Sequence, residues 1–444
     1  MKKLEKRSII CILIAVVLLA GVGLFVFRFV KHGGEWASFY GNQQIYTDGL
    51  LNRGTITDRN GELLLDCTED GIIYSDDWST RVATVHAVGD PKGNIATGAI
   101  NVFKGQLIGY DIINGTYDTS SEGKKIKLTI DSRANIAAYN ALGGRTGTVG
   151  VMNWKTGEIV CMVSTPSFDP AGSLPSDDGS SYYFNNFMSG TMTPGSTFKL
   201  VTSAAVIDTM DDRGSFEFHC DGVNKIGKDK LTDVSAHGTV GFKSALAKSC
   251  NGAFGELTRR VGAETMRKYV DKLGLTKAVV VNGVETAIGS FDFPDDNEVK
   301  LSWAGIGQAD DQVNPCAMMV YMGAIANGGK SVQPTLIKSA TFLKDIAGGK
   351  SGGRYLSEDT ANELRKMMKN NVKKNYGAGN YPGLNLYAKS GTAEVGDRSD
   401  AWFVGFIDNE DNPYAFVVWV KGGGFGSQVA GPIARTVLNT LIEK

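Results

Sequence analysis

The segment Thr193-Pro-Gly-Ser-Thr-Phe-Lys199 decides how this chain folds around its chemistry. Proline and glycine predict a turn, and the apolar run Phe198 to Val206 predicts a helix directly after it. Ser196 therefore falls in the first helical turn, where backbone N–H groups without an intrahelical partner can face a developing oxyanion. Lys199 follows three residues later and is expected on the same helix face.

The pair Ser196 and Lys199 suits acyl transfer, because a serine hydroxyl is a weak nucleophile until a base takes its proton. A neutral lysine can be that base when burial or a second cation lowers the pKa of its ammonium group. Lys389, far along the sequence, is the candidate for the second cation. A Ser-x-x-Lys arises by chance in most long chains, so the pair needs support from other segments.

A second motif, Ser249-Cys-Asn251, follows a helix predicted over Phe242 to Lys248. The side-chain amide of Asn251 can both donate a hydrogen bond to a substrate peptide group and accept one from it. The motif therefore adds a candidate substrate contact to the candidate nucleophile.

A third motif, Lys389-Ser-Gly-Thr392, continues a strand predicted over Leu386 to Ala388. Such a strand can pair with an extended substrate backbone. The small residues Ser390 and Gly391 are expected to leave room for the approach of that substrate.

In this order, the three motifs resemble the active site of penicillin-binding proteins and serine β-lactamases. The resemblance covers residues 53–444, and Arg53-Gly-Thr-Ile-Thr-Asp-Arg-Asn-Gly61 resembles the start of the pedestal domain of class B penicillin-binding proteins. Other segments resemble the family in content and order: Val163 to Asp169, Ile306 to Gln308, Ile325 to Gly329, Ala393-Glu394 and Ala401 to Gly405.

The resemblance implies a role for each motif residue. Ser196 would be the acylated nucleophile, Lys199 the general base and Ser249 a proton relay. The backbone N–H groups of Ser196 and Thr392 would form the oxyanion hole. The implied substrate-binding residues are Asn251 for the substrate amide and, on the third motif, Lys389, Ser390, Gly391 and Thr392.

The same resemblance implies a peptidoglycan D,D-transpeptidase that needs no metal or other cofactor. Its substrates would be cell-wall stem peptides ending in D-Ala-D-Ala, and β-lactam antibiotics would mimic them and acylate the serine. Ser390 stands where threonine is commoner in the family. Because the hydroxyl is retained, we expect activity to persist, while antibiotic affinity can differ.

The strand pattern predicts an α+β fold. Two strands joined by a Lys-Thr-Gly turn are predicted over Gly147 to Val163, and three more near the C-terminus, before a closing helix over Pro432 to Ile442. We expect one antiparallel sheet with helices on its faces and a helical subdomain. The expected divisions are a cytoplasmic tail (1–8), a transmembrane anchor (9–30), a small, mostly β pedestal (31–125) and a transpeptidase domain (126–444).

The run Ile9 to Phe27 has no charged residue and is about long enough to span a bilayer. It is longer than the apolar region of a signal peptide, which favours an uncleaved anchor in the bacterial cell membrane. Positive charge is concentrated before the run, so the N-terminus is expected in the cytoplasm and the catalytic domain outside. The charges that decide this are Lys2, Lys3, Lys6 and Arg7 before the run, against Arg28 and Lys31 after it.

The overall charge excludes one class of partner. With 46 basic and 47 acidic side chains the net charge is -1, which does not favour nucleic acid.

The six cysteines contain no CxxC pair and the four histidines no HExxH, so no zinc site is expected. The cysteines are interpreted as small buried hydrophobic residues.

Two other functions remain open on the sequence. A β-lactamase or D,D-carboxypeptidase would share the fold, although no Glu-x-x-Leu-Asn segment supports a class A β-lactamase. A catalytically silent scaffold of a wall-synthesis complex would not need three sets of reactive groups. A bifunctional class A enzyme needs a glycosyltransferase module, for which the region before the transpeptidase domain is too short. A separate membrane glycosyltransferase is therefore the expected partner.

Overall fold

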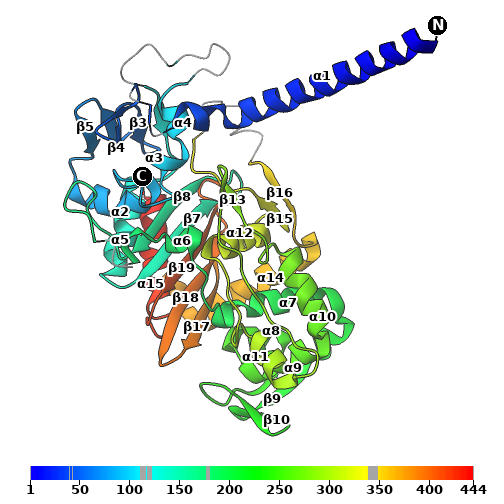
Figure 1. Cartoon of the computed structure of the whole chain (residues 1–444). Coiled ribbons are helices and arrows are strands. Elements are labelled where there is room, and N and C mark those ends of the chain that lie inside the picture. The colour runs from blue at the N-terminus through cyan, green and yellow to red at the C-terminus, as the bar shows by residue number, and fades with distance from the viewer. Residues whose placement is uncertain are drawn as a thin grey trace.

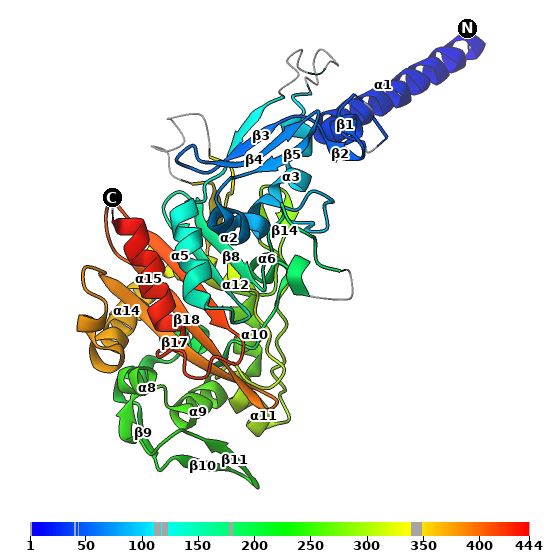
Figure 2. The same cartoon turned by 90° about the vertical axis from the view of Figure 1, so that its left-hand side faces the viewer.

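The computed structural model describes residues 2–39, 41–42, 44–110, 117, 123–176, 181–338 and 349–443. Of the expected pedestal, residues 111–116 and 118–122 lie outside this description. The long helix α1 leads into a small N-terminal sheet, which lies at the α1 end of the body (Figure 1). The helices around β9 and β10 lie at the opposite end of the body in both views (Figure 2).

Helix α1 spans Lys2–Ala37 and projects away from the rest of the protein (Figure 1). Its stretch Glu5–Gly33 contains an 18-residue apolar window with a mean hydropathy of 3.2, of which 0% is buried against the protein. An exposed helix of this length and composition fits a single-pass membrane anchor. The predicted anchor, residues 9–30, lies inside this stretch.

The N-terminal sheet has the strand order β5-β4-β3-β6. Strands β3, β4 and β5 are antiparallel neighbours, whereas β6 pairs in parallel with β3. Strand β6 crosses the expected division between residues 125 and 126. Residues on both sides of that division therefore complete the N-terminal sheet. The strands of this region are β1 (Tyr46–Thr47), β2 (Leu50–Leu51), β3 (Thr55–Thr57), β4 (Leu63–Thr68), β5 (Gly71–Tyr74) and β6 (Lys125–Lys127).

The N-terminal region also contains helices that the sequence analysis did not predict. The main one, α2 (Trp78–Val88), begins at Asp77, whose carboxylate accepts the backbone N–H groups of Ser79 and Thr80. It packs against helix α5 (Ser132–Leu142) and strand β8 of the main body. Two short helices follow, α3 (Ala99–Val102) and α4 (Lys104–Leu107). The region is thus rich in β-structure, as predicted, but is joined to the body through a helix.

The main sheet has five antiparallel strands in the order β17-β18-β19-β7-β8, which confirms the predicted sheet. Its centre joins distant parts of the sequence, because Val417 of β19 pairs with Gly150 of β7. The strands are rich in β-branched and aromatic residues, which suit a sheet buried on both faces. They are β7 (Gly147–Asn153), β8 (Ile159–Thr165), β17 (Leu386–Val395), β18 (Arg398–Ile407) and β19 (Tyr414–Val420).

Helices cover both faces of this sheet. Helix α5 and the C-terminal helix α15 (Ala430–Ile442) pack together and on the sheet, as the sequence predicts. Helix α12 (Pro315–Ala326) contacts β7, β18 and β19, and every one of its residues is buried. Burying a large aliphatic side chain stabilises a fold by about 1.5–3 kcal/mol, so α12 contributes strongly to the core.

The remaining helices form the predicted helical subdomain, which holds the first two motifs. Its helices are α7 (Lys199–Thr209), α8 (Phe242–Lys248), α9 (Asn251–Val261), α10 (Ala263–Lys272), α11 (Glu298–Ala304) and α14 (Glu358–Asn371). The short elements between and beside them are α6 (Asn186–Ser189), β9 (Glu217–Cys220), β10 (Val223–Ile226), β11 (Asp229–Thr232), β12 (Gly238–Gly241), β13 (Val280–Val281), β14 (Val284–Glu285), β15 (Lys330–Val332) and β16 (Ser351–Arg354).

Candidate active site

Ser196 lies in a 3₁₀ turn, Gly195–Thr197, just before helix α7. The sequence analysis placed it in the first turn of the helix itself, which begins only at Lys199. Gly195 has φ +53°, and a Cβ there would lie 2.6 Å from the carbonyl oxygen of Thr392. A glycine is required because the turn that carries Ser196 packs directly on the third motif.

Hydrogen bonds from distant elements hold this turn in place. The buried Trp402 of β18 donates from Nε1 to the carbonyl oxygen of Thr193 over 2.9 Å. The backbone N–H of Gly195 donates to the carbonyl oxygen of Gly307 over 2.8 Å. The segments of Trp402 and Gly307 resemble the family in sequence, but their contacts with this turn could not be predicted without the fold.

Lys199 is fully buried and brings the first two motifs together. Its Nζ lies 3.1 Å from the Oγ of Ser196. It donates to the carbonyl oxygen of Ser249 and to the Oδ1 of Asn251, each over 2.6 Å. The nitrogen is therefore positioned to exchange a proton with the serine hydroxyl.

Ser249 connects the two lysines of the site. Its Oγ accepts a hydrogen bond from Lys389 Nζ over 2.9 Å and lies 3.3 Å from Lys199 Nζ. The residue ends α8 in the left-handed conformation, with φ 58°. Such a conformation costs about 1–3 kcal/mol for a residue other than glycine, and it is commonest at functional sites.

Asn251 is the first residue of α9, and its side chain is already engaged on both sides. The Oδ1 accepts from Lys199, and the Nδ2 donates to the carbonyl oxygen of Thr232 over 2.7 Å. A substrate that contacts this amide must share or replace one of these bonds. The structure thus places Asn251 at the site, held more firmly than the sequence suggested.

The third motif lies on β17, which has one strand neighbour, β18, among the described residues. Its free side can accept an extended chain. Ser390 is held by Tyr376, whose hydroxyl accepts from the backbone N–H of Ser390 over 2.8 Å and lies 3.1 Å from its Oγ. No motif pointed to Tyr376, which lies at the end of the π-helical turn Val372–Tyr376.

Gly391 has a packing role that the sequence analysis did not predict. A Cβ at this buried position would lie 2.9 Å from Cγ2 of Thr197 and 3.0 Å from the carbonyl oxygen of Pro194. Gly391 therefore makes room for the turn that carries Ser196. Ser390 and Thr392 alternate with it and are half-buried.

The transpeptidase-domain model of the penicillin-binding proteins matches residues 147–439, which is more than half of this chain. The chain belongs to the penicillin-binding protein transpeptidase family. This membership confirms the family, the fold class and the enzyme class that the three motifs predicted. The matched residues contain all three motifs.

Known relatives agree with this assignment. The peptidoglycan D,D-transpeptidase PbpA of Mycobacterium tuberculosis is 28% identical over 365 residues, which cover 72% of this chain and 73% of the relative. The stage V sporulation protein D of Bacillus subtilis is also 28% identical, over 72% of this chain and 54% of its own length. The ceftriaxone acyl-enzyme structure of M. tuberculosis penicillin-binding protein A superposes with a TM-score of 0.75 and 25% identity, over 88% of this chain and 98% of that one.

The two lysines of this transpeptidase have lowered pKa values. Burial lowers the pKa of Lys199 to about 8, against the opposing effects of Asp233 and Cys250. Burial also lowers the pKa of Lys389 well below its usual range, and the nearby Lys199 lowers it further. The sequence analysis assigned the shift of Lys199 to either burial or Lys389, and burial is its main cause.

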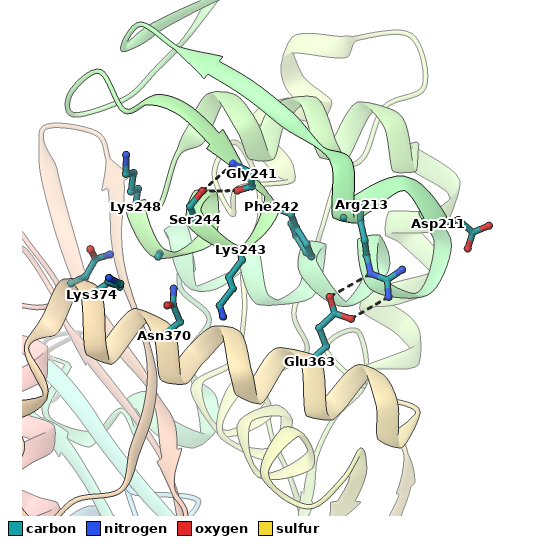
Figure 3. A pocket seen from close by; sticks show the side chains of 13 residues that line it. Asp211, Arg213, Gly241, Phe242, Lys243, Ser244, Lys248, Glu363, Asn370 and Lys374 are labelled. Atoms are coloured by element: carbon teal, nitrogen blue, oxygen red, sulfur yellow. Dashed lines mark hydrogen bonds and ion pairs between the residues drawn. The ribbon is translucent and has the colours of Figure 1, made fainter.

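A groove of about 960 Å³ lies between α8 and α14 of the transpeptidase (Figure 3). Its described lining includes Lys243, Lys248 and Lys374, but none of the motif residues that surround Ser196. The Arg213–Glu363 ion pair, 3.2 Å long, closes one part of it. The three motifs therefore do not line this groove.

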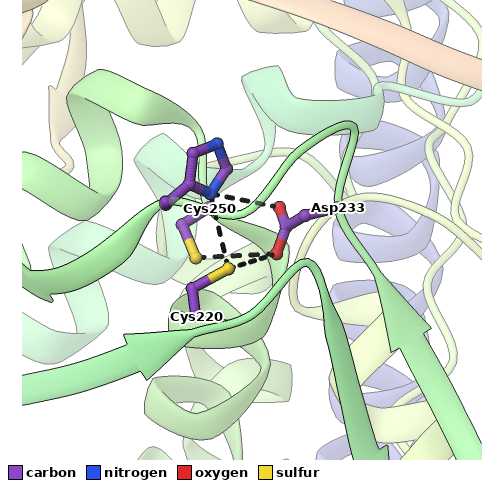
Figure 4. A group of neighbouring side chains, drawn as sticks. Cys220, Asp233 and Cys250 are labelled. Carbon is purple, nitrogen blue, oxygen red and sulfur yellow. Dashed lines mark hydrogen bonds and ion pairs between the residues drawn. The ribbon is translucent and has the colours of Figure 1, made fainter.

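Close to Asn251, four side chains with metal-binding atoms lie together, although the sequence analysis expected no metal site. Their ligand atoms all lie within 4.8 Å of one another (Figure 4). The residues are Cys220, Asp233, His237 and Cys250.

Proposed function

We propose that this transpeptidase is a monofunctional class B peptidoglycan D,D-transpeptidase that cross-links stem peptides through an acyl-enzyme on Ser196. The 3.1 Å contact between Lys199 Nζ and Ser196 Oγ is the observation that carries the proposal. It is supported by the relatives, which are named as peptidoglycan D,D-transpeptidases.

In the acylation step, neutral Lys199 takes the proton of the Ser196 hydroxyl. The Oγ attacks the carbonyl carbon of the penultimate D-Ala, and the oxyanion accepts hydrogen bonds from the backbone N–H groups of Ser196 and Thr392. The C–N bond then breaks as the departing D-Ala amine receives a proton. Ser249, whose hydroxyl is near both lysines, relays that proton.

In the second step, an amine of a neighbouring stem peptide attacks the ester carbonyl of the acyl-enzyme. Lys199 accepts the proton lost by the amine, directly or through Ser249, and the proton passes to the Ser196 oxygen as the ester bond breaks. The new amide bond is the cross-link. Water must be excluded so that the amine, and not water, attacks the ester. This requires the acceptor peptide to be held close to the acyl-enzyme.

The edge strand β17 supports the recognition of the donor peptide. An extended donor can add to its free side, while Lys389, Ser390 and Thr392 hold the terminal carboxylate. Burial favours an uncharged Lys389 in the free enzyme, and an incoming carboxylate favours its charged form. Asn251 would hold the donor amide.

The same geometry suits acylation by β-lactams. Solved structural neighbours carry ceftriaxone and imipenem as acyl-enzymes. We expect intact-mass analysis after exposure to a fluorescent penicillin to show one adduct, which is lost in Ser196→Ala. An adduct on another serine would contradict the assignment of Ser196. If the parent chain formed no adduct at all, the role of a catalytically silent scaffold would be favoured instead.

We further propose that the N-terminus is cytoplasmic, that the catalytic domain is extracellular, and that a separate membrane glycosyltransferase supplies the glycan strands. External protease on spheroplasts should then digest the bulk of the chain. Purified protein given lipid-linked disaccharide-pentapeptide should make no glycan alone, but should yield cross-linked muropeptides once a glycosyltransferase is added. Glycan made by this chain unaided would refute the monofunctional assignment.

A further inference from the structure

The four metal-binding side chains beside Asn251 come from separate elements of the helical subdomain. Cys220 ends β9, Asp233 follows β11, His237 precedes β12 and Cys250 is the residue before α9. The two cysteines are buried, and their sulfurs and the Asp233 carboxylate point toward one another (Figure 4). Nothing in the proposed transpeptidase mechanism requires two thiols and an imidazole here.

Several distances in this cluster are close to the edges of a tetrahedral zinc site. Asp233 Oδ2 lies 3.4 Å from Cys220 Sγ and 3.6 Å from Cys250 Sγ. His237 Nδ1 lies 3.6 Å from Cys220 Sγ and 3.7 Å from Asp233 Oδ1. Zinc bonds of about 2.3 Å to sulfur and 2.0–2.2 Å to nitrogen or oxygen separate tetrahedral ligands by about 3.3–3.8 Å.

The chemistry of the donors favours zinc over a hard cation such as calcium. Thiolate and imidazole ligands suit zinc, whereas calcium and magnesium take oxygen ligands. The sulfur of Cys250 also accepts the backbone N–H of Ala253 over 3.4 Å.

The cluster is also bonded to the second catalytic motif. Asp233 Oδ1 accepts the backbone N–H of Asn251 over 2.6 Å, and Oδ2 accepts that of Gly252 over 3.0 Å. Cys250 lies between Ser249 and Asn251 in the sequence. Fixing Asp233 and Cys250 would therefore fix the two residues that contact Lys199.

We propose that Cys220, Asp233, His237 and Cys250 bind one zinc ion, which holds Ser249 and Asn251 in position for Lys199. Binding releases a proton from each thiol that becomes a ligand. The ion has a positioning role and does not touch the reacting atoms. Its binding is independent of the proposed function, whereas its effect on acylation rests on that function.

The first experiment measures metal content. The full chain, purified in detergent with its affinity tag removed, should contain about one zinc per chain by elemental mass spectrometry. Cys220→Ala should lose it, and the matched control Cys67→Ala, a buried cysteine of β4 outside the cluster, should retain it. A parent chain without zinc after growth and purification with added zinc would overturn the proposal.

Cobalt provides a second measurement on the unmodified chain, which does not depend on how variants fold. Cobalt(II) in place of zinc should show tetrahedral ligand-field bands and thiolate-to-metal charge transfer. Added zinc should abolish both signals. A Cys220–Cys250 disulfide, detected by alkylation and peptide mass in protein purified without reductant, would instead assign the pair to redox chemistry and refute the zinc site.

The positioning role is tested by the rate of Ser196 acylation with a fluorescent penicillin. Removing the metal with a chelator should slow acylation by about 10- to 100-fold, since small misplacements of catalytic groups have effects of that size. His237→Ala should behave like the chelated protein, and His237→Cys, which keeps a zinc ligand, should restore both zinc and rate. Unchanged acylation without metal would refute the positioning role, whereas zinc-loaded protein that never acylates would refute the proposed function instead.

Discussion

At the scale of single residues, the site depends on a buried amine beside a serine hydroxyl. The sequence predicted this pairing because Ser196 and Lys199 are three positions apart at a helix start. It could not predict that Ser249 lies between Lys199 and Lys389, since that contact joins residues 140 apart. The metal-binding cluster was missed for the same reason, because its four residues meet only after β9 to β12 have folded.

Acylation of Ser196 should increase with pH up to about 8. Lys199 acts as a base only when it is neutral, and its pKa is lowered to about 8. Below that value the second-order rate constant with a fluorescent penicillin, whose carboxylate stays ionised over this range, should fall about tenfold per pH unit. Stopped-flow fluorescence between pH 5.5 and 9 tests this, and a flat profile would remove Lys199 from the role of base. Lys199→Met should acylate too slowly to show a profile.

Gly391→Ala should strongly reduce the rate of penicillin acylation, although it should not open the active site to solvent. The new Cβ would press on Thr197 and on the carbonyl oxygen of Pro194, moving the turn of the nucleophile. Overpacking of this kind costs about 1–3 kcal/mol, or roughly a 5- to 150-fold change in rate if it is felt in the transition state. Gly379→Ala is the control, because nothing lies within 4 Å of its added Cβ. Equal acylation rates in the two variants would contradict the close packing described here.

At the scale of secondary structure, strands were easier to predict than short helices. Runs such as Tyr414–Val420 contain the β-branched and aromatic residues that favour strands, and their alternation with turns marked all five strands of the main sheet. Helix α2 was missed because its threonines, serine and valines have weak helix propensity. Its Asp77 cap and its packing on α5 supply what the local sequence lacks.

The π-helical turn Val372–Tyr376 supports the edge strand, and Tyr376→Phe should reveal this. The variant removes the acceptor for the backbone N–H of Ser390 and the contact with its Oγ. A polar group left without its partner costs about 1–3 kcal/mol, so penicillin acylation should slow on the order of tenfold. Tyr381→Phe is the matched control, because Tyr381 is a buried tyrosine that stacks on Phe403. A similar rate for both variants would show that Tyr376 does not position Ser390.

At the scale of the whole molecule, the sequence analysis identified the order of the parts but not how they join. It predicted an anchor, a β-rich region and an α+β body. It did not predict that β6 crosses residue 125 to complete the N-terminal sheet, because a three-residue strand carries too little pattern. The apolar clusters show the same continuity, since residues of β3 and β4 belong to one core with residues of α7 and α12.

Removal of residues 1–30, the predicted tail and anchor, should leave a folded, water-soluble enzyme. The apolar window of α1 buries 0% of its residues against the protein, so little packing is lost. Gel filtration without detergent should give a monodisperse species, and the midpoint of thermal unfolding should lie within a few degrees of the full chain in detergent. A cooperative loss of stability or of penicillin acylation would show that α1 supports the fold.

The pairing of β7 with β19 also bears on how the enzyme is made. The first two strands of the main sheet are synthesised long before their central partner, β19 (Tyr414–Val420). Pairings so distant in sequence form slowly, and until then the β7 side stays an open sheet edge. A chain released before residue 386 would carry Ser196 without β17, and therefore without Lys389. The order of the strands thus delays the assembly of a reactive acylating centre until β17 has been synthesised.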